Sequence, residues 1–375
     1  MAQLPKFNFT CGNFDDGLLP VKQVLVNSLR RVETHRLRSS LGYCGPKGAD
    51  ELRDALLKMI LVERGMRCTR KTIAITCGAL HTVTLLGLML SKKFSQATVA
   101  VEMPGYFGFR KTLRMLGIRV LALPVDEEGA YPDVGVISQS HAVILTPRHH
   151  FPTNVTMSSA RRATFRELAE QGKCLVVEDD YSCDFEFQAT EIRPLSMGKL
   201  RRGLVYVGSF SKSLAPGLRL GYVVAEPRIV EDLSAIRWRI DRHSPELLQL
   251  VLAELIRSGE YKTAVERTMQ SYKSRWLAMG TALEKHFGFT SQATGGLSFW
   301  LPAQTNWESI HAIASHSEHL GIRFTSGLDC YDTPPGFGAL RLGYTCVSLD
   351  QIDIGVQNLA QCFRDVLGSV PKWKR

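Results

Sequence analysis

The sequence predicts an α/β protein in which a large, mostly parallel sheet with helices on both faces is joined to a smaller C-terminal α/β unit. Short runs rich in valine, isoleucine and leucine alternate with helical patterns between residues 72 and 224. Few polar residues interrupt these runs, as expected for strands that are buried on both faces. Beyond residue 230 long helical patterns dominate, which indicates a change of architecture.

Seven short apolar runs are the expected strands of the large unit. They are Thr72–Thr76, Ala97–Glu102, Val120–Leu123, Ala142–Thr146, Cys174–Glu178, Leu204–Val207 and Leu220–Val224. Helical spacing of apolar residues predicts a helix over residues 49–65, which ends at Gly65. Further helices are expected between the strands, at His81–Ser91, Phe107–Leu116 and Ser159–Gln171. Because ligands bind outside the carboxyl ends of parallel strands, residues that follow a strand are candidates for function.

The second unit is expected to contain long helices and two strands. The helical patterns cover Pro245–Arg257, Tyr261–Phe287, Trp307–Leu320 and Leu349–Leu367, and the strand candidates are Gly296–Leu301 and Leu340–Tyr344. We therefore divide the chain into an N-terminal segment that packs near the active site (residues 1–40), a large domain (41–260) and a small C-terminal domain (261–375).

Charge and cysteine content narrow the class of protein. The chain has 46 lysines and arginines against 36 acidic residues, so an anionic substrate, a phosphorylated cofactor or a nucleic acid would suit its surface. Nine scattered cysteines without a Cys-x-x-Cys pair argue against a zinc site or a disulfide framework. The N-terminus lacks a secretory signal pattern, and no apolar run is long enough to span a membrane. We expect a cytoplasmic protein without a membrane partner.

The stretch SFSKSLAPGLRLGY follows the expected strand Leu204–Val207 and places Lys212 and Arg219 in one short loop. A partly desolvated lysine near other cations has a lowered amine pKa, which suits an imine-forming nucleophile. A guanidinium binds phosphate through two parallel hydrogen bonds, and Ser209 and Ser211 add hydroxyl groups. This loop therefore indicates a chemical role for Lys212 and Arg219 rather than residues that only cap a loop.

Three other expected strands end in residues that could bind a ligand. The acidic run EDD at residues 178–180, read alone, is typical of a metal site or a solvated loop. We rank a metal low because no histidine or further carboxylate stands nearby at ligand spacing. The turn CGAL at residues 77–80 opens a helix, whose first backbone N–H groups could hold a phosphate. Tyr106, after the third of these strands, is a core tyrosine or a stacking partner for a ring.

Taken together, these motifs resemble the cofactor-binding segments of fold-type I pyridoxal-phosphate enzymes, the aspartate-aminotransferase superfamily. The resemblance extends from about residue 7 to residue 360. It implies a catalytic Lys212 that forms the internal aldimine with pyridoxal 5′-phosphate. It also implies that Ser209, Ser211 and Arg219 bind the cofactor phosphate. Asp179 would keep the ring nitrogen protonated, so that the ring can act as an electron sink.

The resemblance assigns further catalytic and cofactor-binding residues. The Tyr181 hydroxyl would reach the 3-oxygen of the ring, and Tyr106 would stack on the ring face. Gly78, Ala79 and Leu80 match the phosphate-binding turn, although many relatives have Ser-Gln where this chain has Ala79-Leu80. The backbone donors survive this change, whereas two side-chain donors are lost.

One motif of the superfamily is altered in this chain. Many aminotransferases have an Asn-Pro-Thr-Gly segment whose asparagine contacts the 3-oxygen of the cofactor. Here the corresponding segment reads TPRHHFPTN, with Phe151 before the proline and Asn154 at the end. The contact of that asparagine is therefore missing or moved, and His149 and His150 could be structural hydrogen bonders.

The ends of the chain complete the resemblance. Arg341 lies in the apolar run ALRLGY, and a buried arginine needs an anionic partner. In the superfamily this arginine binds the substrate carboxylate; a salt bridge to Asp or Glu is the alternative. The segment FNFTCG, ending at Gly12, resembles the segment that folds over the active site and contacts substrate. Tyr43 matches a tyrosine that reaches the phosphate of the neighbouring subunit, which implies a homodimer with shared active sites.

Three motifs resemble the aminotransferase-like domain of MocR-type regulators, which join a winged-helix DNA-binding domain to this fold. They are EDDY at residues 178–181, TPRHHFP at 146–152 and GGLSFWL at 295–301. Because the first motif begins at residue 7, we expect no winged helix and no direct nucleic-acid binding in this chain. Two functions remain open. One is a pyridoxal-phosphate-dependent aminotransferase acting on an amino acid and a 2-keto acid; the other is an amine-sensing effector domain. Decarboxylation, racemisation or oxidation of an amino acid are further alternatives.

Overall fold

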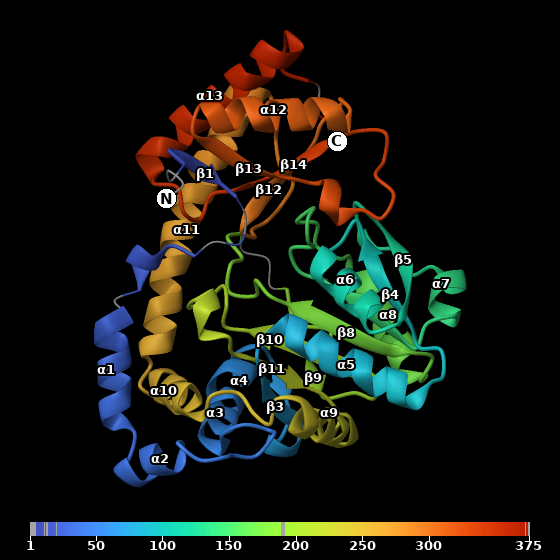
Figure 1. Cartoon of the computed structure of the whole chain (residues 1–375), viewed down its shortest axis with the longest axis vertical. Helices are drawn as coiled ribbons and strands as arrows, with labels where there is room; N and C mark the ends of the chain where they lie inside the picture. Colours follow the sequence, from blue (N-terminus) through green and yellow to red (C-terminus); the bar gives the residue numbers. More distant parts are fainter. Residues whose placement is uncertain are drawn as a thin grey trace.

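The computed structural model of the chain describes residues 5–10, 12, 14–19, 21–188, 192–371 and 373. It contains a large sheet with helices on both faces and a smaller sheet. The long helix α11 (Glu260–Phe287) extends from the region of the large sheet to that of the small sheet (Figure 1). The predicted α/β class, the mostly parallel large sheet and the smaller C-terminal α/β unit are confirmed. The domain boundaries at residues 40 and 260 stay predictions.

Eight strands form the large sheet. Their bounds are β3 Ile73–Thr76, β4 Thr98–Met103, β5 Arg119–Asp126, β6 Gly129–Ala130, β7 Ala142–Leu145, β8 Leu175–Asp180, β10 Leu204–Ser209 and β11 Gly221–Val224. The spatial order is β3-β11-β10-β8-β7-β4-β5-β6. The series from β10 to β5 is parallel, whereas β11 is antiparallel to both of its neighbours. Each of the seven expected strands occurs here; the short β6 was not expected.

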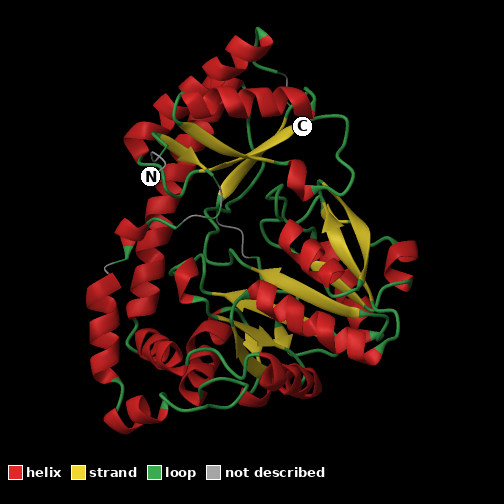
Figure 2. Ribbon diagram, in the orientation of Figure 1, coloured by secondary structure: helices red, strands yellow, loops and turns green. Residues whose placement is uncertain are grey.

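Helices flank this sheet (Figure 2). Their bounds are α1 Val21–Arg31, α2 Thr34–Ser39, α3 Asp50–Ala55, α4 Leu61–Glu63, α5 Ala79–Lys93, α6 Phe107–Met115, α7 Val134–Ser138, α8 Ser159–Glu170, α9 Pro227–Ile240 and α10 Glu246–Arg257. The helix expected over residues 49–65 is interrupted by a π-helical turn at Leu56–Ile60. A π-helical turn contains about one residue more than an α-helical turn. The spacing of apolar residues did not reveal it, because the buried stripe continues through the turn.

Successive side chains of a strand point to opposite faces, which explains how the sheet buries both of its faces. Val177, Val207 and Val223 pack in the cluster that also contains residues of α5, α6 and α9. Tyr206 and Tyr222 point the other way, into a cluster with α3 and α10. The strands are thus apolar on both sides, as their uninterrupted apolar runs predicted.

The small sheet has the order β1-β13-β14-β12, with bounds β1 Phe7–Phe9, β12 Ser298–Pro302, β13 Ile322–Ser326 and β14 Ala339–Gly343. Helices α11, α12 (Trp307–His319) and α13 (Leu349–Leu367) contribute to its core. Strand β1 runs parallel to β13, so the N-terminal segment belongs to this sheet. Phe9 is fully buried, and a Cβ added at Gly355 of α13 would lie only 2.7 Å from its ring.

Several elements were not predicted from the sequence. They are α1, α2, α7, α9, β1, β6, β13 and the two-stranded pair of β2 (Met66–Arg67) and β9 (Gly198–Lys199). Most of them are short or have mixed polarity, so tertiary pairing rather than local pattern defines them. Among the described residues, no helix is both long and apolar enough to cross a membrane, and the eight cysteines are free thiols.

The buried position of β1 leads to a stability prediction. Replacing Phe9 with alanine should lower the free energy of unfolding by about 3–5 kcal/mol, because the small-sheet core cannot close the cavity. Urea titration followed by circular dichroism measures this. The exposed Val134→Ala in α7 is the matched control and should shift the midpoint little. Equal small shifts for both variants would show that β1 is not part of the folded core.

Candidate functional site

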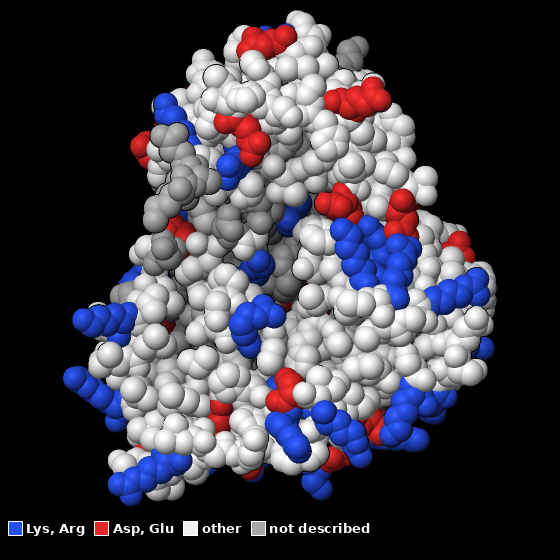
Figure 3. All heavy atoms as spheres, in the orientation of Figure 1, with Lys and Arg blue, Asp and Glu red and all other residues white. Residues whose placement is uncertain are grey.

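The predicted site residues come together where the carboxyl ends of β3, β4, β8 and β10 meet. Lys212 follows β10, Asp179 lies at the end of β8, and Tyr106 follows β4. Gly78 follows β3, and Arg219 directly precedes the antiparallel β11, which starts at the same edge. Figure 3 shows a hollow between the two sheet regions, with Lys or Arg side chains on its walls. The topology thus brings residues far apart in sequence to one edge.

Lys212 is half-buried and lies against the N-terminal segment. Its Nζ donates a hydrogen bond to the carbonyl oxygen of Gly12 over 2.9 Å. Gly12 has a φ of +93°, and a Cβ at this position would lie 3.4 Å from the Lys212 amine. Only glycine adopts this backbone conformation without strain. The structure therefore places Gly12 beside the lysine; its predicted contact with substrate stays a prediction.

Asp179 is a buried carboxylate that faces the site. Its side chain is 7% exposed, and its Oδ1 atom has no hydrogen-bond partner among the described residues. Burial raises the pKa of Asp179 to about 7, with a further rise from Asp180 and Glu178, whereas Lys212 lowers it. A buried oxygen without a donor is costly, so this atom suits a group that brings its own proton and positive charge.

The pleat of β8 explains which of the three consecutive acids serves the site. Asp179 lies on the same face as Val177, while Glu178 and Asp180 point to the other face. Asp180 Oδ2 accepts from the Tyr206 hydroxyl at 2.9 Å, and Glu178 Oε1 accepts from the Leu195 backbone N–H at 3.0 Å. These two carboxylates are therefore structural, which supports the assignment of Asp179.

The turn after β3 has the features of an anion site. Gly78, with a φ of +100°, precedes α5, so the N–H groups of Ala79 and Leu80 lie at a helix N-terminus. Arg219 lies opposite, and its Nη2 donates to the carbonyl oxygen of Cys77 over 2.9 Å. A Cβ at Gly78 would be 3.8 Å from this guanidinium. The cation and the helix N-terminus therefore converge, as a phosphate requires.

The serines of the lysine loop lie between β10 and Lys212. Ser209 is the last residue of β10, and its Oγ accepts from the backbone N–H of Ser211 over 3.1 Å. Both serines are half-buried. This hydrogen bond closes a tight turn at the strand end, so Ser209 shapes the loop that carries the lysine.

Tyr106 stands between the acidic and basic parts of the site. It precedes α6, and its ring contacts Phe109 edge-on at 5.0 Å and Phe151 edge-on at 5.4 Å between centroids. Burial raises the pKa of its hydroxyl; Asp179 raises it further and Arg219 lowers it. Its ring therefore lies near both groups, a suitable place for a stacking partner.

Arg341 reaches the site from the small sheet. It is a buried residue of β14, and its guanidinium lies over the ring of Phe151, 4.2 Å from the centroid. Phe151 thus contacts both Arg341 and Tyr106. The sequence analysis noted Phe151 only as a departure from the superfamily; its position before a proline at a strand end was the available signal.

The neighbouring residues of the altered motif have structural roles. Asn154 donates from Nδ2 to the carbonyl oxygen of Ser298, so its amide joins the two sheet regions. This agrees with the expectation that the asparagine contact is missing or moved. His149 Nε2 lies 3.2 Å from Glu186 Oε2. The Tyr181 hydroxyl donates to the His149 carbonyl oxygen over 2.9 Å, so its predicted contact with a ring oxygen stays untested.

Tyr43 does not take part in this constellation within one chain. Its side chain is 84% exposed in the loop between α2 and α3, and its ring lies 6.2 Å from that of His243. Its predicted contact with a neighbouring subunit stays a prediction.

The match to a known family now decides the class of the protein. The family model "aminotransferase class I and II" matches residues 5–317. The chain belongs to this family. Its fold agrees: α-aminoadipate aminotransferase LysN from Thermus thermophilus, complexed with N-(5′-phosphopyridoxyl)-L-leucine, superimposes with a TM-score of 0.83 at 24% identity, over 96% of this chain and 93% of that one.

Relatives of this aminotransferase-family chain include regulators as well as an enzyme. The HTH-type transcriptional regulator TauR of Rhodobacter capsulatus is 33% identical over 90% of this chain and 69% of the regulator. A 2-aminoadipate transaminase of Thermus thermophilus is 28% identical over 93% of this chain and 88% of the enzyme. The predicted similarity to MocR-type regulators is therefore confirmed.

The cofactor of this family member is pyridoxal 5′-phosphate, and the site residues fit it. The Oδ1 of Asp179 lacks a donor, which a protonated ring nitrogen would supply. The turn at Gly78 and the Arg219 guanidinium suit the phosphate, and Lys212 has a primary amine for the aldehyde.

Asp179 leads to a prediction about stability and pH. The carboxyl pKa is raised in the folded protein, so the folded state binds an extra proton and stability falls as pH rises from about 4 to about 7. The apoprotein should therefore melt at a lower temperature at pH 8 than at pH 5. Asp179→Asn should reduce this difference, because its amide cannot ionise; differential scanning fluorimetry measures both.

The matched control for this experiment is Glu127→Gln, in an exposed turn. It should leave the pH dependence of the melting temperature unchanged. A decrease in melting temperature from pH 5 to pH 8 that is equal in Asp179→Asn and in the wild type would contradict the prediction. It would mean that Asp179 ionises at low cost in the apoprotein.

Proposed function

We propose that the protein is a pyridoxal-phosphate-dependent aminotransferase that moves an amino group between an amino acid and a 2-keto acid. The observation that carries this proposal is the convergence of the Lys212 amine, the buried Asp179 carboxylate and the Arg341 guanidinium around one edge of the large sheet. Many different reactions occur on this fold, so family membership alone does not identify the reaction. The proposal therefore depends on these side chains.

Each residue has a defined task in this reaction. When bound, pyridoxal phosphate supplies an electron sink that makes the α-hydrogen of an amino acid acidic. Asp179 holds the charge that keeps the ring nitrogen protonated. Lys212, as a free amine, takes the α-proton on Nζ and returns it, acting as general base and then as general acid. Arg341 binds the α-carboxylate, because its fork matches a carboxylate through two hydrogen bonds.

Aromatic side chains support these tasks. Tyr106 packs edge-on against Phe151, and Phe151 packs under the Arg341 guanidinium, so we expect these rings to limit the access of water to the site. A drier site strengthens the electrostatic interactions of both charged groups. Phe151 also fixes the plane of the arginine through its ring, which helps to orient the substrate carboxylate.

The test of the function is a two-step spectroscopic experiment. Purified protein with pyridoxal phosphate is mixed with a panel of amino acids, and the visible band of the bound cofactor is followed. An aminotransferase converts this band to that of pyridoxamine phosphate and regains it after addition of a 2-keto acid. Loss of a general acid–base group typically lowers a rate by about 10²–10⁴-fold. Lys212→Ala should therefore lower the rate of this conversion about a thousandfold or more.

Lys173→Ala is the control, since Lys173 is exposed in a turn after α8. It should behave as the wild type. A wild-type band that changes on addition of the amine but never returns with a keto acid contradicts transamination. A different product from the amino acid, identified by mass spectrometry, would assign decarboxylation, racemisation or oxidation instead.

A second function is favoured by one observation, the 33% identity to a transcriptional regulator over 90% of the chain. In that case the same residues would bind the cofactor and an amine without turnover, as an effector domain. The departures at Ala79 and Leu80, which remove two side-chain donors from the phosphate turn, suit a site with little need for tight binding. The absence of product in the experiment above would support this function.

We further propose that the chain acts in the cytoplasm as a homodimer with shared active sites. Apolar side chains are exposed on α1 (Val21, Leu25, Val26, Leu29), at Leu41 and Tyr43, and at Trp238 and Ile240 near the end of α9. Apolar surface of this extent marks interaction sites. Trp238 lines the same cleft as Cys44 and Lys47, and Cys44 is the chain neighbour of Tyr43. The exposed apolar surface at the end of α9 therefore lies beside the tyrosine that would reach the partner subunit.

The dimer predicts an effect of Tyr43 on the cofactor. Tyr43→Phe should weaken pyridoxal phosphate binding about five- to tenfold through the loss of one hydrogen bond to the partner-bound phosphate. Equilibrium titration measures the affinity, and light scattering after gel filtration should give the mass of a dimer. Tyr131→Phe, half-exposed elsewhere, is the control. A monomeric mass together with unchanged affinity would contradict shared sites.

A further inference from the structure

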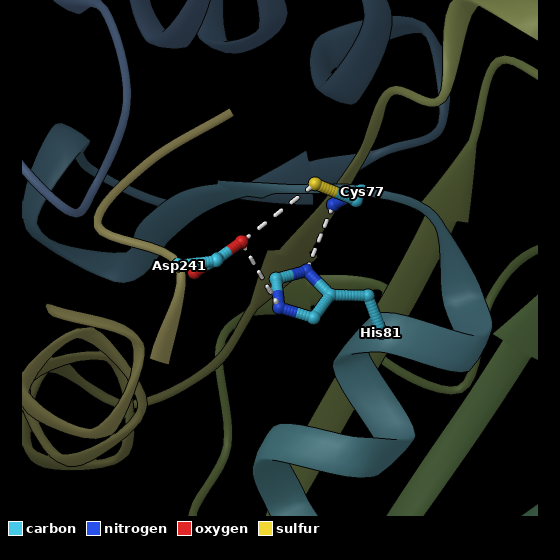
Figure 4. Close-up of side chains that lie close together, drawn as sticks. All are labelled: Cys77, His81 and Asp241. Atoms are coloured by element: carbon cyan, nitrogen blue, oxygen red, sulfur yellow. Dashed lines mark hydrogen bonds and ion pairs between the residues drawn. The ribbon is translucent and has the colours of Figure 1, made fainter. Parts of the chain in front are cut away.

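Three polar residues meet beside the phosphate-binding turn and have no place in the reaction described above. Cys77 precedes the turn, His81 lies in the first turn of α5, and Asp241 follows α9 (Figure 4). The backbone N–H of Cys77 donates to His81 Nδ1 over 3.0 Å, and His81 Nε2 lies 3.5 Å from Asp241 Oδ2. The thiol of Cys77 lies 3.9 Å from the same carboxylate.

This triad has metal-ligand side chains, but its hydrogen bonds do not suit a metal. Because Nδ1 of His81 accepts a hydrogen bond from a backbone N–H, a neutral ring carries its own proton on Nε2. A metal bound at Nε2 would need the opposite tautomer. The guanidinium of Arg237 also occupies this place, with Nη2 3.4 Å from Asp241 Oδ2 and 3.8 Å from the Cys77 thiol.

The hydrogen bonds instead fix two successive peptide groups of the turn. His81 holds the N–H of Cys77, and Arg219 holds the carbonyl oxygen of Cys77 over 2.9 Å. The peptide that follows Cys77 is planar and trans, so the direction of this carbonyl also sets the direction of the Gly78 N–H. The start of α5 is thereby oriented before any ligand arrives.

We propose that His81, held by Asp241, is a positioning residue that shapes the turn which binds the cofactor phosphate. This inference rests on the assignment of pyridoxal phosphate as the cofactor. His81 itself does not touch the phosphate in this arrangement: it acts through the Cys77 peptide. The third residue of the helix thus bonds a backbone N–H that precedes it, as in a helix-capping arrangement.

The chain has a particular need for such support. Ala79 and Leu80 provide no side-chain hydrogen bonds, so at this turn the phosphate depends on backbone N–H groups, beside the ligands expected from the lysine loop, Arg219 and the two serines. Backbone donors bind well only when their directions converge, because hydrogen bonds weaken steeply as they bend. A turn that is free to rotate would lose these donors together.

The remaining contacts anchor His81 to the body of the large domain. Asp241 accepts from Arg237, whose Nε lies 3.2 Å from Asp241 Oδ1. Arg237 is 1% exposed, donates to the carbonyl oxygen of Ile75 in β3 and bonds the Ser244 hydroxyl over 2.7 Å. The charges of Arg237 and Asp241 offset each other. Burial and Arg237 lower the pKa of His81, with a smaller opposing effect of Asp241, which agrees with a neutral ring.

The test measures how much the phosphate contributes to the binding affinity, separately from the rest of the cofactor. Full-length apoprotein is titrated with pyridoxal phosphate and with pyridoxal, which lacks the phosphate, in the wild type, His81→Ala and His81→Asn. His81→Ala should weaken pyridoxal phosphate binding about tenfold and pyridoxal binding less than about twofold. His81→Asn should recover most of the loss, because its Oδ1 can take the place of Nδ1 as the acceptor.

The control is His141→Ala. Nδ1 of His141 also accepts from a backbone N–H, that of Thr98, over 3.0 Å, but at the amino end of β4. This variant loses the same kind of hydrogen bond away from the turn and should leave both affinities unchanged. A loss in His81→Ala that is equal for the two ligands, or absent, would overturn the proposal.

A measurement on the wild type does not depend on how the variants fold. Nitrogen-15 NMR of the histidine-labelled apoprotein, with His81→Asn used to assign the signal, should show the proton of His81 on Nε2. A proton on Nδ1 would overturn the proposal even if the cofactor binds. Failure of the cofactor assignment is distinguishable, because pyridoxal phosphate would then bind no better than pyridoxal in the wild type.

Discussion

The burial of the Asp179 carboxylate at the end of β8 is the constraint around which the site is built. A carboxylate without a donor on Oδ1 is unfavourable in an apolar setting, and its raised pKa expresses this cost. The Lys212 amine compensates part of this cost, since it lowers the pKa of Asp179. A cationic ring nitrogen offsets the cost more fully, so the folded protein is prepared for a cofactor that brings a positive charge.

The large sheet makes this arrangement possible because it separates structural from functional acids. Glu178 and Asp180 lie on the opposite face of β8 from Asp179, where one oxygen of each accepts a hydrogen bond, from the Leu195 N–H and the Tyr206 hydroxyl respectively. Arg148 Nε lies 3.6 Å from Asp180 and adds a charge partner. The pleat therefore gives the three consecutive acids different hydrogen-bond partners, although Asp180 and Glu178 still raise the pKa of Asp179.

The strands and the site loops were predictable because burial and turn residues leave local patterns in the sequence. Lys212, Asp179 and Gly78 each follow an apolar run, so topology alone brings them together. The small sheet was less predictable: β13 has mixed polarity, and β1 is defined by its pairing with β13. The roles of Phe151 and His81 depend on contacts with distant residues, Arg341 and Asp241, that no local pattern reveals.

The small sheet connects Arg341, the proposed ligand of the substrate carboxylate, to the lysine. Arg341 lies on β14, β14 pairs with β13, and β13 pairs with β1, which leads to the Gly12 carbonyl that accepts from Lys212. Arg110 of α6 attaches this unit to the large domain through the carbonyl oxygens of residues 329–331. If a carboxylate bound at Arg341 displaced the small sheet, the hydrogen bond from Lys212 Nζ to the Gly12 carbonyl oxygen would change as well. Because Lys212 must lose a proton to act as a base, catalysis and sensing would then differ in how far such a displacement frees its Nζ, not in which residues are present.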